Sequence, residues 1–165
     1  EIESFSDQGL RTLSVAYREF ASRPESAEEG QLEQGLTLVA LLGLEDPVRD
    51  EVPGAIRTCK RAGIVVRMVT GDNPRTAAAI AKKCGIMGDD DEFTIMTGPE
   101  FRERVLDDND EIKMDEFNKI WPNLRVLARS SPLDKLTLVT GIQRSRIGTP
   151  QTVAVTGDGT NDAPA

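Results

Sequence analysis

The sequence predicts an α/β protein with a doubly wound, mainly parallel sheet. Short apolar runs that are typical of strands alternate with segments whose apolar residues recur at helical spacing. Strands and helices that alternate in this way form a parallel sheet with helices packed on both faces. The composition, 38% hydrophobic and 29% charged over 165 residues, suits one globular domain, or one domain with a piece of another.

The first 45 residues do not follow this alternation. Residues 1–12 are helix-like, and residues 13–17 alternate between apolar and polar positions as a strand does. Residues 22–34 are acidic and rich in turn formers, which predicts an exposed loop. Residues 36–44 form a continuous apolar run, which predicts a strand covered on both faces. This run is the longest in the sequence and only about half as long as a membrane span, so we do not expect these residues to cross a bilayer.

The alternation of helices and strands begins after Pro47. Proline near the start and glycine at the end bound several of the helices, as is typical of helix termini. The expected elements are, in chain order, a helix over 52–63, a strand over 64–69, a helix over 74–85, an acidic insertion over 86–120 with a strand near 93–96 and one or two helices, a strand over 124–128, a helix from 131 that carries Leu133, Leu136 and Val139, and a strand over 152–155.

The charge is unevenly distributed along the chain. Residues 1–35 carry a net charge of −5 and residues 86–120 carry −8, whereas the rest carries +5, for a total of −8. The acidic total argues against a nucleic-acid-binding protein. The positive remainder could attract a phosphorylated ligand. The charges alone agree equally well with two solvated acidic segments on a neutral fold.

The histidine and cysteine content limits the reaction mechanisms that this chain can use. The sequence contains no histidine, which excludes every mechanism that needs an imidazole. The two cysteines, Cys59 and Cys84, form no CxxC pair and fall on apolar helical stripes. They are therefore expected to be buried thiols of a protein in a reducing compartment.

Two of the predicted strands end in the same tripeptide, at residues 70–72 and 156–158. In open α/β sheets ligands bind at the carboxyl ends of strands, so Asp72 and Asp158 are expected at one crevice. Asn161 and Asp162 follow Asp158 closely, and clustered oxygen ligands of this kind suit Mg²⁺. The alternative is that each aspartate only caps the following helix, and it is stronger for Asp72, which no such cluster follows.

Basic residues follow the predicted strand at 124–128. Arg129 stands at the end of that strand, and Lys135 lies in the first turn of the following helix, where backbone amides favour anions. A lysine in this place can hold a phosphoryl group, although a solvated surface lysine is the alternative. Asp46-Pro-Val-Arg49 predicts a rigid joint, because an acid and a base three residues apart can brace a proline turn. The alternative is an ordinary turn with no further role.

Together these motifs resemble the phosphorylation domain of P-type cation pumps, which belong to the haloacid dehalogenase superfamily. The resemblance covers nearly the whole chain and is most specific at Thr156-Gly-Asp-Gly-Thr-Asn-Asp-Ala-Pro-Ala165. The segments 62–73, 81–85 and 126–135 are more similar to the plasma-membrane type of calcium pump than to the sarcoplasmic-reticulum type.

The resemblance implies a division of the chain and a set of site residues. Residues 1–45 would be the C-terminal piece of a nucleotide-binding domain, and residues 46–165 a phosphorylation domain, with ATP as substrate and Mg²⁺ as cofactor. The implied residues are Arg11, Asp46, Arg49 and Arg129 for the nucleotide, Asp158 for the metal, and Thr70, Gly71, Asp72, Lys135, Asn161 and Asp162 for the phosphoryl site.

One departure from the family pattern is large. The family's phosphorylated aspartate stands in an Asp-Lys-Thr-Gly-Thr motif, which these residues lack. We therefore expect a fragment of a pump, on the cytosolic face of a plasma or internal membrane, with calcium passing through transmembrane segments and other domains outside these residues. The alternative is a stand-alone phosphatase of the superfamily, or a non-catalytic relative. Its only candidate nucleophile, Asp46, lacks the second acid two residues on, where Val48 stands.

The absent motif has a structural consequence. In this superfamily the strand that carries the phosphorylated aspartate is central to the sheet, and its loss would leave unpaired strand edges. We expect either that residues 36–44 occupy the open slot or that strands pair between two chains in a dimer; the alternative is a native-like sheet with a solvent-filled gap.

Overall fold

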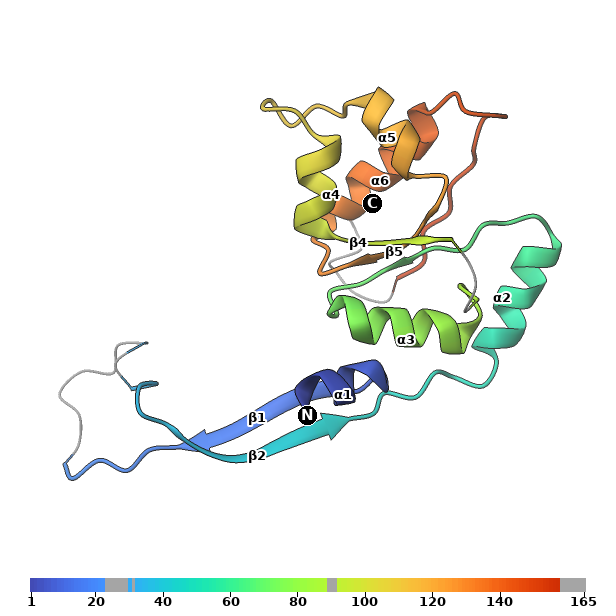
Figure 1. Cartoon of the computed structure of the whole chain (residues 1–165). Helices are drawn as coiled ribbons and strands as arrows, with labels where there is room; N and C mark the ends of the chain where they lie inside the picture. The colour runs from blue at the N-terminus through green and yellow to red at the C-terminus, as the bar shows by residue number, and fades with distance from the viewer. Residues whose placement is uncertain (23–29, 31, 89–91, 158–165) are drawn as a thin grey trace.

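The computed structural model describes residues 1–22, 30, 32–88 and 92–157. Figure 1 shows a small parallel sheet with helices on both faces, and an antiparallel hairpin that projects away from it. The parallel sheet has the strand order β3-β5-β4, and β1 and β2 form the hairpin. This architecture confirms the predicted α/β class. The elements are α1 Ile2–Asp7, β1 Arg11–Tyr17, β2 Thr37–Leu44, α2 Val52–Arg61, β3 Met68–Val69, α3 Pro74–Cys84, β4 Thr94–Thr97, α4 Gly98–Val105, α5 Met114–Ile120, β5 Leu124–Ala128 and α6 Pro132–Arg144.

The central strand, β5, carries core residues on both faces. Leu124 and Leu127 are buried with residues of α4, α5 and α6, whereas Val126 and Ala128 are buried with residues of α2 and α3. A shift in the β4–β5 register inserts Arg125 as an extra residue in β5. This bulge explains why Leu124 and Val126 belong to different clusters although they are two residues apart.

The helix α3 forms as the sequence predicts. The side chain of Asn73 caps it by accepting a hydrogen bond from the Thr76 amide at 3.0 Å. Gly85 ends it with a φ of +79°, a left-handed conformation that favours glycine. Cys84 at its last turn is buried, as expected, whereas Cys59 on α2 is only half-buried.

The predicted helix over residues 1–12 is only half correct. The helix α1 ends at Asp7, and the chain turns at Gly9 with a φ of +81° before β1 begins at Arg11. The side chains of Ala79 and Ile80 on α3 lie directly against Gly9, so the turn is also a close approach between the two segments. The predicted loop at 22–34 lies mostly outside the described residues.

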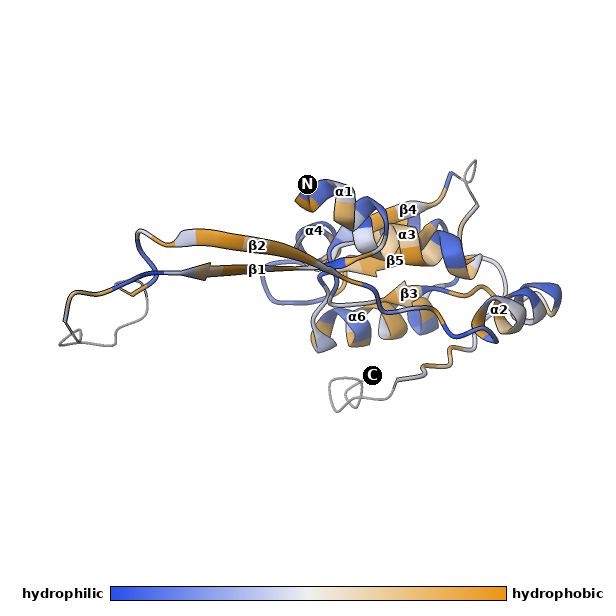
Figure 2. Cartoon of the chain, turned by 90° about the horizontal axis from the view of Figure 1, so that it is seen from below, coloured by the Kyte–Doolittle hydropathy of each residue, from blue (hydrophilic) through white to orange (hydrophobic). Residues whose placement is uncertain are grey.

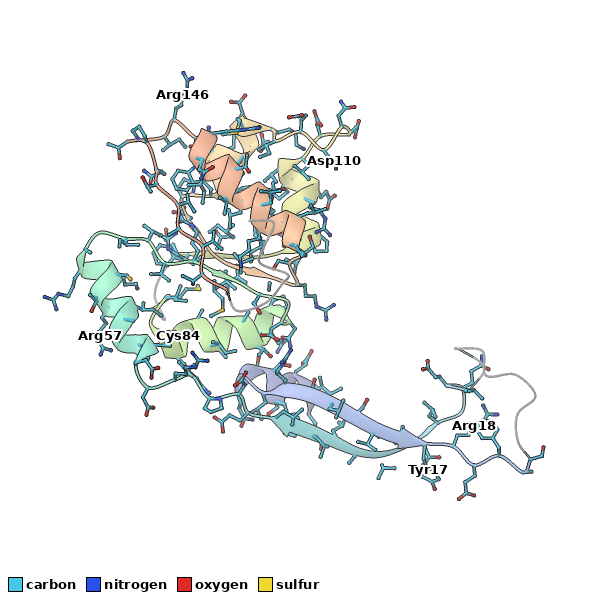
Figure 3. All side chains as sticks on the ribbon, turned by 180° about the vertical axis from the view of Figure 1, so that it is seen from behind. Tyr17, Arg18, Arg57, Cys84, Asp110 and Arg146 are labelled. Carbon is cyan, nitrogen blue, oxygen red and sulfur yellow. The ribbon has the colours of Figure 1, made fainter. Side chains whose placement is uncertain are left out.

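The apolar run at 36–44 is a strand, but the predicted burial on both faces is wrong. It pairs as β2 with β1, from Arg11 opposite Leu44 to Tyr17 opposite Thr37. Figure 2 shows this hairpin as an apolar ribbon that extends from the rest of the chain, and Figure 3 places Tyr17 and Arg18 at its far end. Several of its large apolar side chains are therefore more than 40% exposed, among them Leu13, Val15, Leu38 and Val39. The expectation that this run fills a slot in the parallel sheet is wrong as well, since its partner is β1.

The predicted strand at 64–69 is shortened to Met68–Val69. The side chain of Arg67 explains where the ladder stops, because its Nε donates to the carbonyl of Leu124 at 3.1 Å, in place of a strand amide. Its Nη2 donates to the carbonyl of Trp121 at 3.1 Å. Burial, with Arg125 nearby, lowers the pKa of Arg67 to about 10.

The predicted strand at 152–155 does not form. Residues 151–157 have no regular structure, although Val153 packs against the core beside α4–α6. Within the described ranges no strand pairs with the edge of β3 that faces away from β5. The run at 152–155 therefore adds no strand to the described sheet.

The helix α6 begins where predicted, but it buries a different face. Leu133 is 67% exposed and Leu136 is exposed as well, whereas Leu138 and Ile142 are buried against α4 and α5. Across the part of the chain that the structure describes, no helix is long and apolar enough to span a membrane.

The packing predicts that Phe117→Ala lowers the free energy of unfolding by about 3–5 kcal/mol. Phe117 is fully buried, lies edge-on to Phe101 with ring centroids 6.2 Å apart, and fills the space beside Gly141. The matched control is Phe20→Ala, on an exposed ring near Arg18, with an expected loss below about 1 kcal/mol. Urea unfolding measures both, and equal losses would contradict the assigned core.

Candidate functional site

The loops that follow β3 and β5 meet at the carboxyl edge of the sheet. The Thr70 amide donates a hydrogen bond to the Leu127 carbonyl at 2.9 Å, and the Ser130 amide donates to the Thr70 carbonyl at 3.0 Å. The Arg129 amide donates to the Asp72 carbonyl at 2.9 Å. These bonds bring together two motifs that are almost 60 residues apart, at the edge where ligands bind in open α/β sheets.

The Asp72 carboxylate is held by side chains from two segments. One oxygen, Oδ2, accepts a hydrogen bond from Thr70 Oγ1 at 3.1 Å, and the other, Oδ1, lies 3.3 Å from Nε of Arg11. The N-cap of α3 is Asn73, so the alternative that Asp72 merely caps this helix is wrong. Asp72 is instead a partly buried acid that faces a cation from the start of β1.

An open, polar pocket lies over these residues. Its volume is about 360 Å³. Two arginines and a single carboxylate are among the residues that line it, a charge balance that favours an anionic ligand. Its lining residues are Arg11, Thr12, Gly71, Asp72, Asn73, Thr76 and Arg129.

Arg129 has a backbone conformation that is unusual for a residue with a side chain. Its φ is +45°, in the left-handed region that L-residues rarely adopt. The hydrogen bond from its amide to Asp72, and the bonds from Ser130 to the Thr70 carbonyl, hold the turn in this state. Strained residues of this kind cluster at functional sites, which agrees with the placement of Arg129 at the pocket.

The start of α6 contains a buried acid. Ser131 caps the helix, and its side chain and amide both donate to Oδ2 of Asp134, at 2.9 and 2.7 Å. Nη1 of Arg102, on α4, contacts both carboxylate oxygens of Asp134 at 2.7 and 2.5 Å. Asp134 is fully buried, and Lys135, the next residue, is half-buried.

The structure brings together only part of the predicted site. Arg11, Gly71, Asp72 and Arg129 line one pocket, and Thr70 supports it through Asp72. Lys135 does not line this pocket but lies in the first turn of α6, as predicted.

Two of the predicted residues do not line the pocket, and three others are not among the described residues. Asp46 and Arg49 are exposed in the linker between β2 and α2, and among the described residues no ion pair joins them. Asp158, Asn161 and Asp162 lie outside the described residues.

Sequence reasoning missed several residues of this region. Thr12, Asn73 and Thr76 line the pocket, and the pair Arg102–Asp134 lies behind the turn that holds Arg129. The Ser131-Pro-Leu-Asp134 pattern is a capping-box signal that could have identified Asp134. Nothing in the sequence indicates its partner on α4.

The described residues alone do not form a Mg²⁺ site. Asp72 is the single carboxylate of the pocket, and it already faces Arg11. In the described ranges there is no group of three or more aspartate, glutamate or cysteine side chains that could hold a metal ion.

The fold agrees with a comparison against known families. A family model described as haloacid dehalogenase-like hydrolase matches residues 6–165. The chain therefore belongs to the haloacid dehalogenase-like hydrolases.

Three similar relatives are plasma membrane calcium-transporting ATPases. The chain is 54% identical over 168 residues to plasma membrane calcium-transporting ATPase 1 of Gallus gallus, and 54% identical over 167 residues to plasma membrane calcium-transporting ATPase 3 of Homo sapiens. It is 55% identical over 166 residues to plasma membrane calcium-transporting ATPase 4 of Bos taurus. Each match covers 99% of this chain and 14% of the relative, so the chain spans about a seventh of the length of these curated relatives. These matches confirm the resemblance to plasma-membrane calcium pumps.

The two ion pairs of this region should differ in their contribution to stability. Arg102→Leu leaves the buried Asp134 without its cation and should lower the free energy of unfolding by about 3–5 kcal/mol. Arg11→Leu should lower it by less than about 1 kcal/mol, because the Arg11 side chain is 64% exposed and water screens its attraction to Asp72. Urea unfolding of both variants tests this, and a larger loss for Arg11→Leu would contradict it.

Proposed function

We propose that this chain is part of the catalytic region of a P-type calcium-transporting ATPase, which couples ATP hydrolysis to ion transport through an aspartyl-phosphate. The observation that carries the proposal is the pocket at the carboxyl edge of the sheet, which Arg11 and Arg129 line together with Asp72, the partner of Arg11. A pocket lined by two cations and one carboxylate suits a phosphorylated ligand. The names of the relatives, which match 99% of the chain, supply calcium as the transported ion.

The chain would contain pieces of two domains. Residues 1–45 would belong to a nucleotide-binding domain and residues 46–165 to the phosphorylation domain. In support, β1 and β2 form a sheet of their own, separate from the parallel sheet. The exposed linker with Asp46 and Arg49 would be the hinge between the two domains, close to the nucleotide.

The proposed roles of the site residues follow from their places. Arg11, which lies on the first residue of β1, would contact the phosphates of ATP, and Arg129 would assist on the opposite side of the pocket. Thr70, Gly71 and Asp72 would line the phosphoryl site, and Lys135 would neutralise charge on the transferred phosphate.

Three further residues, which lie outside the described ranges, complete the proposal. Asp158 would bind Mg²⁺, and Asn161 and Asp162 would support the phosphoryl group; the metal would supply charge neutralisation at the transferred phosphate. The acceptor aspartate would come from a part of the pump outside this chain.

The pump as a whole would place this region on the cytosolic face of a membrane. Calcium would cross through membrane-spanning segments that are not among these residues, and the other pump domains would be its immediate partners. In the isolated chain, the open edge of β3 and the exposed hairpin β1–β2 would favour a strand-swapped dimer.

A stand-alone phosphatase of the same family is the second candidate, and the geometry does not favour it. Such an enzyme needs a nucleophilic aspartate at the end of a strand in the parallel sheet, ahead of Thr70. The only candidate, Asp46, follows β2, which belongs to the hairpin and not to the parallel sheet.

Acid-quench labelling with γ-labelled ATP tests the proposal. The full-length protein that contains this chain should form a hydroxylamine-sensitive phosphoenzyme, and the isolated chain should form none because it lacks the acceptor motif. In the full-length protein, Asp158→Asn should remove most of the label while Asp108→Asn, an exposed acid away from the pocket, should leave it unchanged. A stable labelled band on the isolated chain, or full labelling of the Asp158→Asn variant, would overturn the proposal.

A further inference from the structure

The ion pair between Arg102 and Asp134 lies directly behind the turn that carries Arg129. Asp134 is fully buried and receives hydrogen bonds from the Ser131 amide, the Ser131 hydroxyl and Nη1 of Arg102. Arg102 comes from α4, which follows the edge strand β4, whereas Ser131 and Asp134 begin α6. The pair therefore joins two helices that the sequence separates by about 30 residues.

The start of α4 packs tightly on the same turn. A Cβ atom on Gly98 would lie 2.5 Å from Oδ2 of Asp134 and 2.7 Å from the carbonyl oxygen of Arg129. It would also lie 3.1 Å from Cα of Ser130. No side chain fits at Gly98 without moving this turn, so α4 and Asp134 enclose it from one side.

The turn is also held by the loop that follows β3. Arg129 donates its amide to Asp72, and Ser130 donates both its amide and its hydroxyl to the Thr70 carbonyl. A left-handed φ such as the +45° of Arg129 is maintained only where surrounding contacts stabilise it. Here the contacts with Gly98 and Asp134 and the hydrogen bonds to the loop after β3 stabilise it together.

The Arg102–Asp134 pair also changes the electrostatic potential near the first turn of α6. A buried, unpaired carboxylate at Asp134 would lie one residue from Lys135 and would repel an anion near the first turn of α6. Contact of Arg102 with both carboxylate oxygens offsets this charge. The charge of Asp134 then does not oppose an anion that binds near Arg129.

We propose that Arg102 and Asp134 are positioning residues for the phosphoryl site, which hold the turn at residues 129–131 and the first turn of α6 so that Arg129 and Lys135 present their charges in fixed places. Neither residue lines the pocket, so both act through their neighbours. This inference rests on the proposed function, since it assigns the pair to phosphoryl transfer.

The test uses the full-length protein that contains this chain and the double variant Arg102→Leu/Asp134→Asn. Asparagine keeps an oxygen for the Ser131 amide and leaves no buried charge unpaired, so the melting temperature should stay close to that of the wild type. The rate of phosphoenzyme formation at saturating ATP should fall about tenfold, and the KM for ATP should rise by more than about twofold, because the turn that the pair holds carries Arg129, a proposed contact of the nucleotide.

Two single variants accompany it. Arg102→Lys keeps the charge of Asp134 offset but loses the planar guanidinium, and it should lower the phosphorylation rate about threefold at an unchanged melting temperature. Glu116→Gln breaks an exposed ion pair with Lys119, at 2.6 Å on α5, and should change neither quantity. If the double variant unfolds early, Arg102→Lys decides the question.

The outcomes separate the two hypotheses. Wild-type phosphorylation rates in both Arg102 variants, in a wild-type protein that labels normally, would overturn the positioning role alone. A wild-type protein that forms no phosphoenzyme would overturn the proposed function and this inference with it. A lower rate with a higher KM for ATP and an unchanged melting temperature in the Arg102 variants, and not in Glu116→Gln, is the result expected.

Discussion

Three backbone hydrogen bonds join the residues that follow β3 to β5 and the turn after it, and the candidate site depends on them. The amides of Thr70, Arg129 and Ser130 donate across this junction at 2.9 to 3.0 Å. Backbone bonds of this kind are possible only because β5 is buried between two clusters of apolar side chains, which fix its depth and register. The core thus determines where Asp72 and Arg129 meet.

The N-terminal segment reaches this site through polar contacts rather than through a shared core. Arg75 on α3 pairs with Asp7 at 3.2 Å, and the Thr76 hydroxyl donates to the Leu10 carbonyl at 3.3 Å. Arg11 then faces Asp72 at 3.3 Å. Interfaces that are small and polar permit relative motion of the parts they join. Arg11 reaches the pocket across such an interface and can therefore move relative to the sheet. This suits the proposed nucleotide ligand, which would have to enter and leave.

The sequence predicted what local patterns determine and missed what distant contacts determine. Local residue order predicts helix α3, with its asparagine cap and its glycine end, and the buried strand β5. It also predicts that Thr70–Asp72 lie at the end of a strand. Burial of the run at 36–44 could not be predicted, because the same apolar pattern serves a covered strand and an exposed hairpin. The short strand β3 depends on where the Arg67 side chain finds the Leu124 carbonyl, 57 residues away. The partner of Asp134 likewise comes from a different helix, so only the structure reveals it.

Native-state hydrogen exchange on this chain tests most directly whether the turn after β5 is held by the sheet. Amides that open only with a cooperative unit exchange at the rate of that unit, whereas amides of a loose turn exchange independently and fast. The account predicts that the Arg129 and Ser130 amides exchange as slowly as those of β5, since all of them are bonded into one junction. Exchange of these two amides at the rate of exposed loop residues, while β5 stays protected, would contradict it.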